Sequence, residues 1–311
     1  MLKDILPSFI YQSITLKNSE QEINEIRFRK DKPIVVLCNT KTYFLSNNGL
    51  CSSANQAIIS SAELINDIVF KACDYSIYSV NEQLKQGFLM VDGGIRLGVC
   101  GEVVQDGGIK TIKNFTSLCV RVPHIIKNAS LPIFSHIVNN GNINNTLIIS
   151  PPGAGKTTML RDIVYQFSYH NYPYNIFIAD ERGEITCGNN SNFLNSYFYD
   201  SICFLNKKDS IMMGLRCMSP DIIVTDELGN KDDFLALEYA MTCGVKIIAT
   251  LHASSINDLK NKEVFKRVYE QKMFQRIIVL SKENGVGTIQ GVYQENLSKI
   301  YGGVVWRLFW Y

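Results

Sequence analysis

The residues with the clearest chemical potential lie at positions 146–158, which have the sequence TLIISPPGAGKTT. The apolar, β-branched start predicts a buried strand, the prolines and glycines predict a turn, and a helix is expected from Lys156 onward. Gly153 and Gly155 would let the backbone N–H groups converge on phosphate oxygens, and the N-terminus of the helix would add partial positive charge. A strand, a glycine-rich turn and a helix in this order are typical of a phosphate-binding P-loop, or Walker A motif.

Two side chains of this stretch suit a nucleoside triphosphate with its metal. Lys156 would reach the β- and γ-phosphates, and the hydroxyl of Thr157 would hold Mg²⁺. ATP and Mg²⁺ are therefore the expected ligands. Ser150 occupies the first position of the motif, where glycine is usual, but serine is small enough to make the turn. The residues expected to contact the nucleotide are Pro152, Gly153, Ala154, Gly155, Lys156, Thr157 and Thr158.

A pair of acidic residues, Asp226 and Glu227, follows the apolar strand predicted at residues 222–225. This is the arrangement of a Walker B motif, in which Asp226 would support Mg²⁺ through its water shell and Glu227 would orient and deprotonate the attacking water. Glu181 and Glu184 follow another predicted strand. Because the carboxyl ends of parallel strands share one edge of a sheet, these acids should lie near the P-loop.

His252 ends a third strand at the same predicted edge. A sensor of the γ-phosphate and a structural histidine with satisfied hydrogen bonds are both compatible with its spacing.

Composition narrows the class of protein. A length of 311 residues suits two domains, and a hydrophobic fraction of 46% is ample for their cores. A net charge of +2 and a pI near 8.0 predict no large polyanion-binding surface. Nine cysteines without a Cys-x-x-Cys pair indicate reduced thiols in a cytoplasmic protein. The first residues lack the pattern of a signal peptide, and no run approaches ~20 apolar residues. A cytoplasmic location is expected, with any membrane association made through partners.

The order of predicted elements divides the chain. Residues 1–122 predict a smaller mixed α+β domain with a helix over 56–73 and a meander of strands from 88 to 122. Residues 123–145 predict a short helix and a linker. Residues 146–311 alternate strand and helix, which predicts an α/β domain with a parallel sheet covered on both faces. The polar stretch 188–208, rich in Phe and Tyr, is expected to be a loop suited to docking on a neighbour.

Arg96 and Arg121 interrupt otherwise apolar strands of the first domain. Surface positions on edge strands explain this pattern as well as a functional role does.

The series of motifs resembles that of type II and type IV secretion ATPases. These enzymes share a P-loop, an acidic box matched by Asp180-Glu181-x-x-Glu184, a Walker B motif and a histidine box matched by residues 250–253, TLHA. They usually have two residues between an arginine and Pro-Asp and a Gly-Glu Walker B, whereas this chain has three residues and Asp-Glu. Residues 216–229, RCMSPDIIVTDELG, are more similar to the stage III sporulation protein AA family.

The first domain resembles the same family in residues 25–29, 79–88 and 93–101, so the resemblance covers essentially the whole chain. Ser150 and Ile95, where the family often has Gly and His, are departures. The resemblance implies a RecA-like core that hydrolyses ATP to ADP and phosphate, and assembly as a homo-oligomer, which in such motors is a hexamer. It also implies a place at the cytoplasmic base of a membrane complex between mother cell and forespore.

The resemblance also implies partners and further site residues. The expected partners are integral membrane proteins of a secretion-like complex, and no nucleic acid is expected. In related motors, arginines of the first domain reach the γ-phosphate across a subunit boundary, and Arg96 and Arg121 match those places. Within residues 146–311, no further cation is evident for this phosphate beside Lys156.

Three other functions are compatible with parts of the pattern. A nucleic-acid-dependent RecA-type ATPase shares the core, but the near-neutral charge and the lack of a nucleic-acid-binding motif argue against it. A small-molecule kinase shares the P-loop, but Asp226-Glu227 and the strand of His252 favour water as the nucleophile. A nucleotide-binding protein without hydrolysis has the same motifs.

Overall fold

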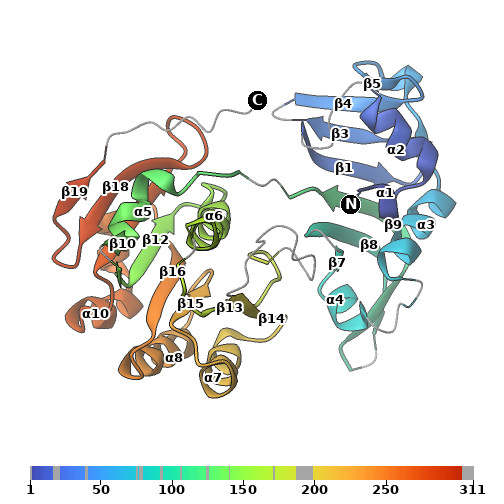
Figure 1. Cartoon of the computed structure of the whole chain (residues 1–311). Coiled ribbons are helices and arrows are strands. Elements are labelled where there is room, and N and C mark those ends of the chain that lie inside the picture. Colours follow the sequence, from blue (N-terminus) through green and yellow to red (C-terminus); the bar gives the residue numbers. More distant parts are fainter. Residues whose placement is uncertain are drawn as a thin grey trace. The chain divides into compact units, whose positions relative to one another are not determined.

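The computed structural model describes residues 2–16, 22–38, 41–74, 76, 80–91, 94–105, 107–123, 126–139, 141–170, 172–186 and 199–302, with only the backbone at 263–265 and 267. Within these ranges the chain forms two compact units, residues 2–123 and residues 126–302 (Figure 1). None of the helices in the described ranges has the length and apolar character that a membrane-spanning helix needs.

The first unit is built on a seven-stranded antiparallel sheet with the order β5-β4-β3-β1-β9-β8-β7. Its strands are β1 (Ile23–Arg29), β3 (Val35–Cys38), β4 (Lys41–Ser46), β5 (Gly49–Cys51), β7 (Phe88–Val91), β8 (Ile95–Gln105) and β9 (Ile109–Arg121), and a separate pair joins β2 (Lys32–Pro33) to β6 (Ile59–Ser60). Its helices are α1 (Leu2–Ile5), α2 (Ser8–Thr15), α3 (Ala62–Ala72) and α4 (Asn81–Lys85), with a 3₁₀ turn at Ala54–Gln56.

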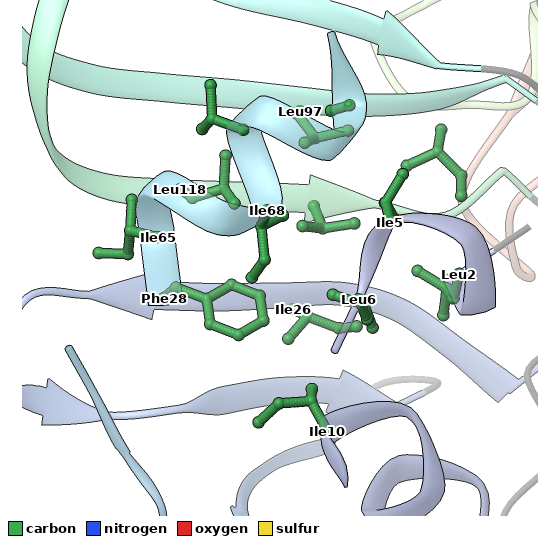
Figure 2. Close-up of a cluster of buried hydrophobic side chains, with 14 of the residues drawn as sticks. Leu2, Ile5, Leu6, Ile10, Ile26, Phe28, Ile65, Ile68, Leu97 and Leu118 are labelled. Carbon is green, nitrogen blue, oxygen red and sulfur yellow. The ribbon is translucent and has the colours of Figure 1, made fainter. Parts of the chain in front are cut away.

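The core of this unit lies between one face of the sheet and its helices. Ile26 and Phe28 of β1 point to this core, where Ile65 and Ile68 of α3 meet them (Figure 2). Because successive side chains of β1 point to opposite faces of the sheet, Arg29 lies on the face away from this core.

Two expectations for this unit differ from the structure. The helix predicted over 56–73 begins only at Ala62, because Ser61 caps it by accepting the backbone N–H of Leu64 at 3.1 Å. Within the predicted meander, the sequence pattern also indicates two separate strands at 108–112 and 117–122, but these residues form one continuous strand, β9.

The second unit is built on an eight-stranded sheet with the order β14-β13-β15-β16-β12-β17-β18-β19. Six strands are mutually parallel, and β18 and β19 extend the sheet antiparallel at one edge. The strands are β12 (Thr146–Ser150), β13 (Ile176–Asp180), β14 (Tyr199–Cys203), β15 (Ile222–Thr225), β16 (Lys246–His252), β17 (Arg276–Ser281), β18 (Thr288–Gln294) and β19 (Lys299–Tyr301).

Helices cover both faces of this sheet. The helices α5 (Leu131–Ile137) and α6 (Lys156–Tyr169) pack on one face, and α7 (Lys207–Cys217), α8 (Lys231–Thr242), α9 (Ile256–Asn261) and α10 (Glu263–Glu270) pack on the other (Figure 1). Successive residues of the central strands belong alternately to the two hydrophobic clusters, as the pleat of a strand requires. The parallel α/β core and the smaller α+β unit before it confirm the predicted fold class.

Residues 123–145, predicted as a short helix and a linker, carry α5 and a small hairpin of β10 (Val138–Asn139) and β11 (Asn142–Ile143). Phe134 of α5 packs on Phe167 of α6 with ring centroids 5.2 Å apart, and buried Asp162 of α6 accepts N–H groups from the start of this segment. Most of the segment therefore belongs to the second unit.

Of the predicted aromatic loop at 188–208, residues 199–203 form the edge strand β14, and residues 188–198 lie outside the described ranges. The sequence pattern also predicts a last strand at residues 304–310, which lie outside the described ranges as well.

Candidate nucleotide-binding site

The predicted P-loop joins the fully buried strand β12 to α6. Gly153 and Gly155 have φ angles of +68° and +93°, which glycine adopts at little cost because it has no Cβ. Gly155 is the N-cap of α6, so Lys156, Thr157 and Thr158 form the first turn of the helix. The loop thus has the backbone conformation that the predicted phosphate cradle requires.

Ser150 fits the turn without the glycine that the motif usually has. Its φ angle lies outside the left-handed region, so the backbone does not require glycine at this position. Its hydroxyl accepts a hydrogen bond from Lys156 Nζ at 3.2 Å, and its carbonyl lies 3.4 Å from the same atom. The departure from the motif therefore supplies an additional acceptor for the P-loop lysine.

A continuous chain of contacts joins Lys156 to Glu227. Lys156 Nζ donates to His252 Nδ1 at 3.0 Å, and because an ammonium can only donate, the His252 proton lies on Nε2. That N–H donates to Glu227 Oε1 at 3.0 Å, and Arg182 Nη1 donates to Glu227 Oε2 at 2.5 Å. Both oxygens of Glu227 and both ring nitrogens of His252 therefore have partners.

Lys156 is held in a poorly solvated position. Its side chain is only 6% exposed, and burial lowers its pKa, with the nearby Lys282 charge acting in the same direction and the Glu227 and Asp226 carboxylates opposing it. A buried ammonium of this kind is stabilised by an anionic ligand.

Glu227 has a strained backbone. Its φ angle is +41°, a left-handed value that costs a residue with a Cβ about 1–3 kcal/mol. Thr250 of β16 stabilises this conformation, since its hydroxyl accepts the N–H of Glu227 at 2.7 Å and its carbonyl accepts the N–H of Leu228 at 2.8 Å. Strain held by a neighbouring strand is typical of a functional residue.

Asp226 has the features expected of a metal-supporting acid. It is 1% exposed, and neither carboxylate oxygen has a hydrogen-bond partner within the described structure. Burial raises its pKa to about 7, and the negative charge of Asp180 adds to this shift. A buried carboxylate that lacks donors fits a hydrated Mg²⁺, which is usually bound through one or two carboxylates together with waters and phosphates. The residues present thus fit the predicted metal.

The acidic box is a turn after β13 that is stabilised by hydrogen bonds. The carboxylate of Asp180 accepts the N–H groups of Glu184, Ile185 and Thr186 at 2.8–2.9 Å. Arg161 of α6 donates to the carbonyl of Glu184 at 2.7 Å, so this turn is tied to the P-loop helix.

Glu181 of the same turn pairs with Lys207 at 2.5 Å, and the Lys207 side chain is only 5% exposed. Glu184 lies near enough to Asp226 for its negative charge to contribute to the raised pKa of that carboxyl.

Comparison with known proteins gives the relationship of the chain. Residues 3–300 match the family described as sporulation stage III, protein AA. A Bacillus subtilis (strain 168) protein named stage III sporulation protein AA is 31% identical over 304 residues, which cover 95% of each chain. The chain belongs to the stage III sporulation protein AA family.

Solved structures show the fold of this family member. The Legionella pneumophila ATPase DotB has a TM-score of 0.52 at 14% identity, over 83% of this chain and 72% of that one. The pilus retraction motor PilT, solved with bound ADP, has a TM-score of 0.54 at 14% identity, over 84% and 74%. The predicted RecA-like fold is thereby confirmed.

Arg96 and Arg121 lie directly opposite each other on β8 and β9, on the outward face of the first unit's sheet. The Arg96 guanidinium lies 4.2 Å from the centroid of the Phe88 ring, and Arg121 Nε lies 3.4 Å from Glu25 Oε2. The predicted nucleotide site belongs to the other unit.

The structure places two cations at the site that the sequence argument missed. Arg182 contacts Glu227, and Lys282 lies over the loop that precedes α6. The expectation that residues 146–311 offer the γ-phosphate no further cation beside Lys156 stays a prediction, for which these two residues are now the candidates to examine. Both residues follow strands whose carboxyl ends lie at the site edge. A search for cations just after each parallel strand would have found them.

Proposed function

We propose that this member of the stage III sporulation protein AA family is a Mg²⁺-dependent P-loop ATPase that hydrolyses ATP to ADP and phosphate. The observation that carries this proposal is the hydrogen-bonded chain from Lys156 through His252 to Glu227. It brings a buried phosphate-binding cation and a candidate base together at one sheet edge.

The P-loop supplies the binding step. Residues 152–158 would present backbone N–H groups to the phosphates, and Lys156 would exchange its bond to His252 for the β- and γ-phosphates. Thr157 and Asp226 would hold the Mg²⁺, which neutralises charge on the phosphate oxygens. The unpartnered carboxylate oxygens of Asp226 and the buried charge of Lys156 support this assignment.

The edge residues supply the hydrolytic step. Glu227 would accept a proton from the attacking water, and His252 would sense the γ-phosphate through the bond that Lys156 gives up. Glu181 and Glu184 of the acidic box would shape the charge around Asp226. The strained φ angle of Glu227 supports its role as the base, because strain of this kind gathers at functional sites.

We further propose that the protein works as a ring-shaped motor, with six subunits the expected number, on the cytoplasmic side of a sporulation membrane complex. Family membership supports the sporulation role, and the fold shared with PilT, a pilus retraction motor, and with the ATPase DotB supports the motor. Integral membrane proteins of that complex would be the partners, and Arg96 and Arg121 would reach the nucleotide of a neighbouring subunit.

Two substitutions test the ATPase proposal. Lys156→Ala should abolish ATP binding because it removes the cation for the phosphates, and Glu227→Gln should bind ATP but hydrolyse it about 100-fold or more slowly. ATP affinity, phosphate release and particle size are measured with Mg²⁺. The controls are Lys260→Ala and Glu270→Gln, exposed residues of the same unit. Undiminished ATP affinity in Lys156→Ala, or wild-type turnover in Glu227→Gln, would reject the assigned roles.

Hydrolysis measured with added DNA distinguishes the proposed motor from a nucleic-acid-dependent ATPase. Single-stranded or duplex DNA should leave the hydrolysis rate unchanged, whereas stimulation that weakens with added salt would favour the other enzyme.

A further inference from the structure

The turn between β17 and β18 is hydrogen-bonded to the P-loop. Gly287 donates its N–H to the carbonyl of Ala154 at 3.1 Å. A Cβ on Gly155 would lie 3.5 Å from both the nitrogen and the Cα of Gly287, and equally close to the Val286 side chain. The backbone of this turn therefore packs directly on the phosphate-binding loop, and its side chains can act on whatever that loop binds.

Lys282 is the first residue of this turn, directly after β17. Its Nζ lies 3.1 Å from the position that a Cβ on Gly153 would take. The side chain is exposed, and no hydrogen bond or ion pair engages its ammonium in the described part of the chain. An exposed lysine would ordinarily extend into solvent, whereas this one lies over the glycine of an anion-binding loop.

Two ammonium groups thus converge on one loop. The charge of Lys282 is near enough to contribute to the lowered pKa of Lys156. Like charges that approach each other in this way are unfavourable unless an anion lies between or beside them. In the described part of the chain, no hydrogen bond or ion pair joins Lys282 to the carboxylates near Lys156. A bound anion would therefore give both ammonium groups a favourable partner.

We propose that Lys282 is a second phosphate-contacting cation of the nucleotide site, supplied by the β17–β18 turn. This inference rests on the proposed function, because the anion is the polyphosphate of a nucleotide. Lys282 adds affinity for the phosphates that ATP and ADP share and contributes nothing to recognition of the nucleoside. Binding also stabilises the turn, since the phosphates then join it to the P-loop in addition to the Gly287–Ala154 hydrogen bond.

The test measures equilibrium binding to the full chain. A fluorescent ADP analogue is displaced by unlabelled ATP, ADP or adenosine, with Mg²⁺ and at two salt concentrations. Lys282→Ala should weaken ATP and ADP binding about tenfold, the lower range for a lost charge-assisted hydrogen bond, and leave adenosine binding unchanged. Lys282→Arg should retain most of the affinity, and the salt dependence should become shallower in Lys282→Ala. Lys260→Ala is the matched control.

The outcomes separate this inference from the proposed function. If the wild type binds ATP and Lys282→Ala binds it within twofold as tightly, the role of Lys282 is rejected and the nucleotide site stands. If the wild type itself binds neither ATP nor ADP, both are rejected. Equal losses for ATP and adenosine would also reject the inference, because they would show a general disturbance of the site. Thermal unfolding of each variant verifies that the exposed substitution leaves the fold intact.

Discussion

The carboxylate of Glu227 is held from two sides, by His252 and by Arg182. His252 links it to the P-loop lysine, and Arg182 links it to the acidic turn after β13. A base that must take a proton from one defined water molecule depends on such fixing, because small displacements of a catalytic group cost large factors in rate. In the proposed mechanism, Arg182 is therefore a positioning residue for Glu227.

Arg182→Ala should lower the turnover number about tenfold and leave the KM for ATP within about threefold, since the substitution loosens the base and spares the P-loop. Arg182→Lys should restore part of the rate because it keeps the charge beside Glu227. Lys208→Ala, an exposed lysine of α7, is the control. Steady-state kinetics check this split. A raised KM with normal turnover would place Arg182 on the nucleotide instead.

Asp226 gives the stability of the metal-free protein a pH dependence. Its pKa is raised by burial to about 7, with Asp180, Glu184 and Glu227 adding negative charge and Lys207 partly opposing them. The folded state therefore keeps a proton that the unfolded chain has lost above its ordinary pKa near 3.8. The unfolding free energy consequently falls as the pH rises through this interval and levels off above about 7.

Asp226→Asn should remove this contribution. Without Mg²⁺, the wild type should lose about 2 kcal/mol relative to the variant between pH 5 and pH 7, and little more between pH 7 and pH 8. Denaturant unfolding in the presence of a chelator measures both proteins at each pH. Parallel curves for the two proteins would show that Asp226 does not titrate in this range.

At the scale of elements, the sequence pattern predicted the strands whose residues are buried. The central strands of the second unit are short apolar runs buried on both faces, and β12, β13, β15, β16 and β17 were all recognisable from the sequence. The strand β14 was not, because its sequence, YDSIC, is half polar and lies at the sheet edge. The start of α3 was misplaced because the cap at Ser61 outweighed the apolar periodicity before it.

The candidate site also has a part that the sequence predicts and a part that it does not. Lys156, Glu227 and His252 could be grouped in advance because each lies at the carboxyl end of a parallel strand or just beyond it. The partners of Glu227 could not, because the direction in which Arg182 leaves its turn depends on the bonds that Asp180 makes with the following backbone. Hydrogen bonds within a turn leave no periodic signal in the sequence.

The turn into α6 provides a test at this scale. Gly155→Ala places a Cβ at a φ angle of +93°, which should cost about 1 kcal/mol of stability and move the N–H groups of the phosphate cradle. ATP affinity should fall at least tenfold. Gly244→Ala is the matched control, since Gly244 has a φ angle of +86° in open space after α8. It should show the same loss of stability with normal ATP affinity. Equal ATP affinity in the two variants would show that ATP binding does not depend on the backbone conformation at Gly155.

For the whole molecule, the two units divide the proposed work. The second unit holds the predicted P-loop and Walker B acids, together with the cations Arg182 and Lys282. The first unit carries Arg96 and Arg121 on an outward sheet face. Because the second unit has cations of its own, the proposed arginines from a neighbouring subunit would control when hydrolysis occurs, in addition to any charge that they add to the transition state.

Substitution of Arg121 should leave the first unit folded. The side chain is 61% exposed, and its partner Glu25 keeps an ion pair with Arg27. Arg121→Ala should therefore retain ATP affinity in the intact second unit and lose hydrolysis, by ~10³-fold if it acts as an arginine finger. Wild-type activity should rise steeply with protein concentration, because the active site then needs two subunits. Lys41→Ala, an exposed cation of the same sheet, is the control.

Mixing two inactive variants distinguishes a trans arginine from a structural one. In a ring that contains both Arg121→Ala and Glu227→Gln subunits, some interfaces join an intact Arg121 to an intact Glu227. Those interfaces should hydrolyse ATP, so the mixture should recover part of the wild-type rate, whereas each variant alone stays inactive. An arginine that acted within its own subunit would give no recovery, because every subunit would lack one of the two groups. Absence of recovery, together with full activity of a diluted monomer, would exclude the ring mechanism.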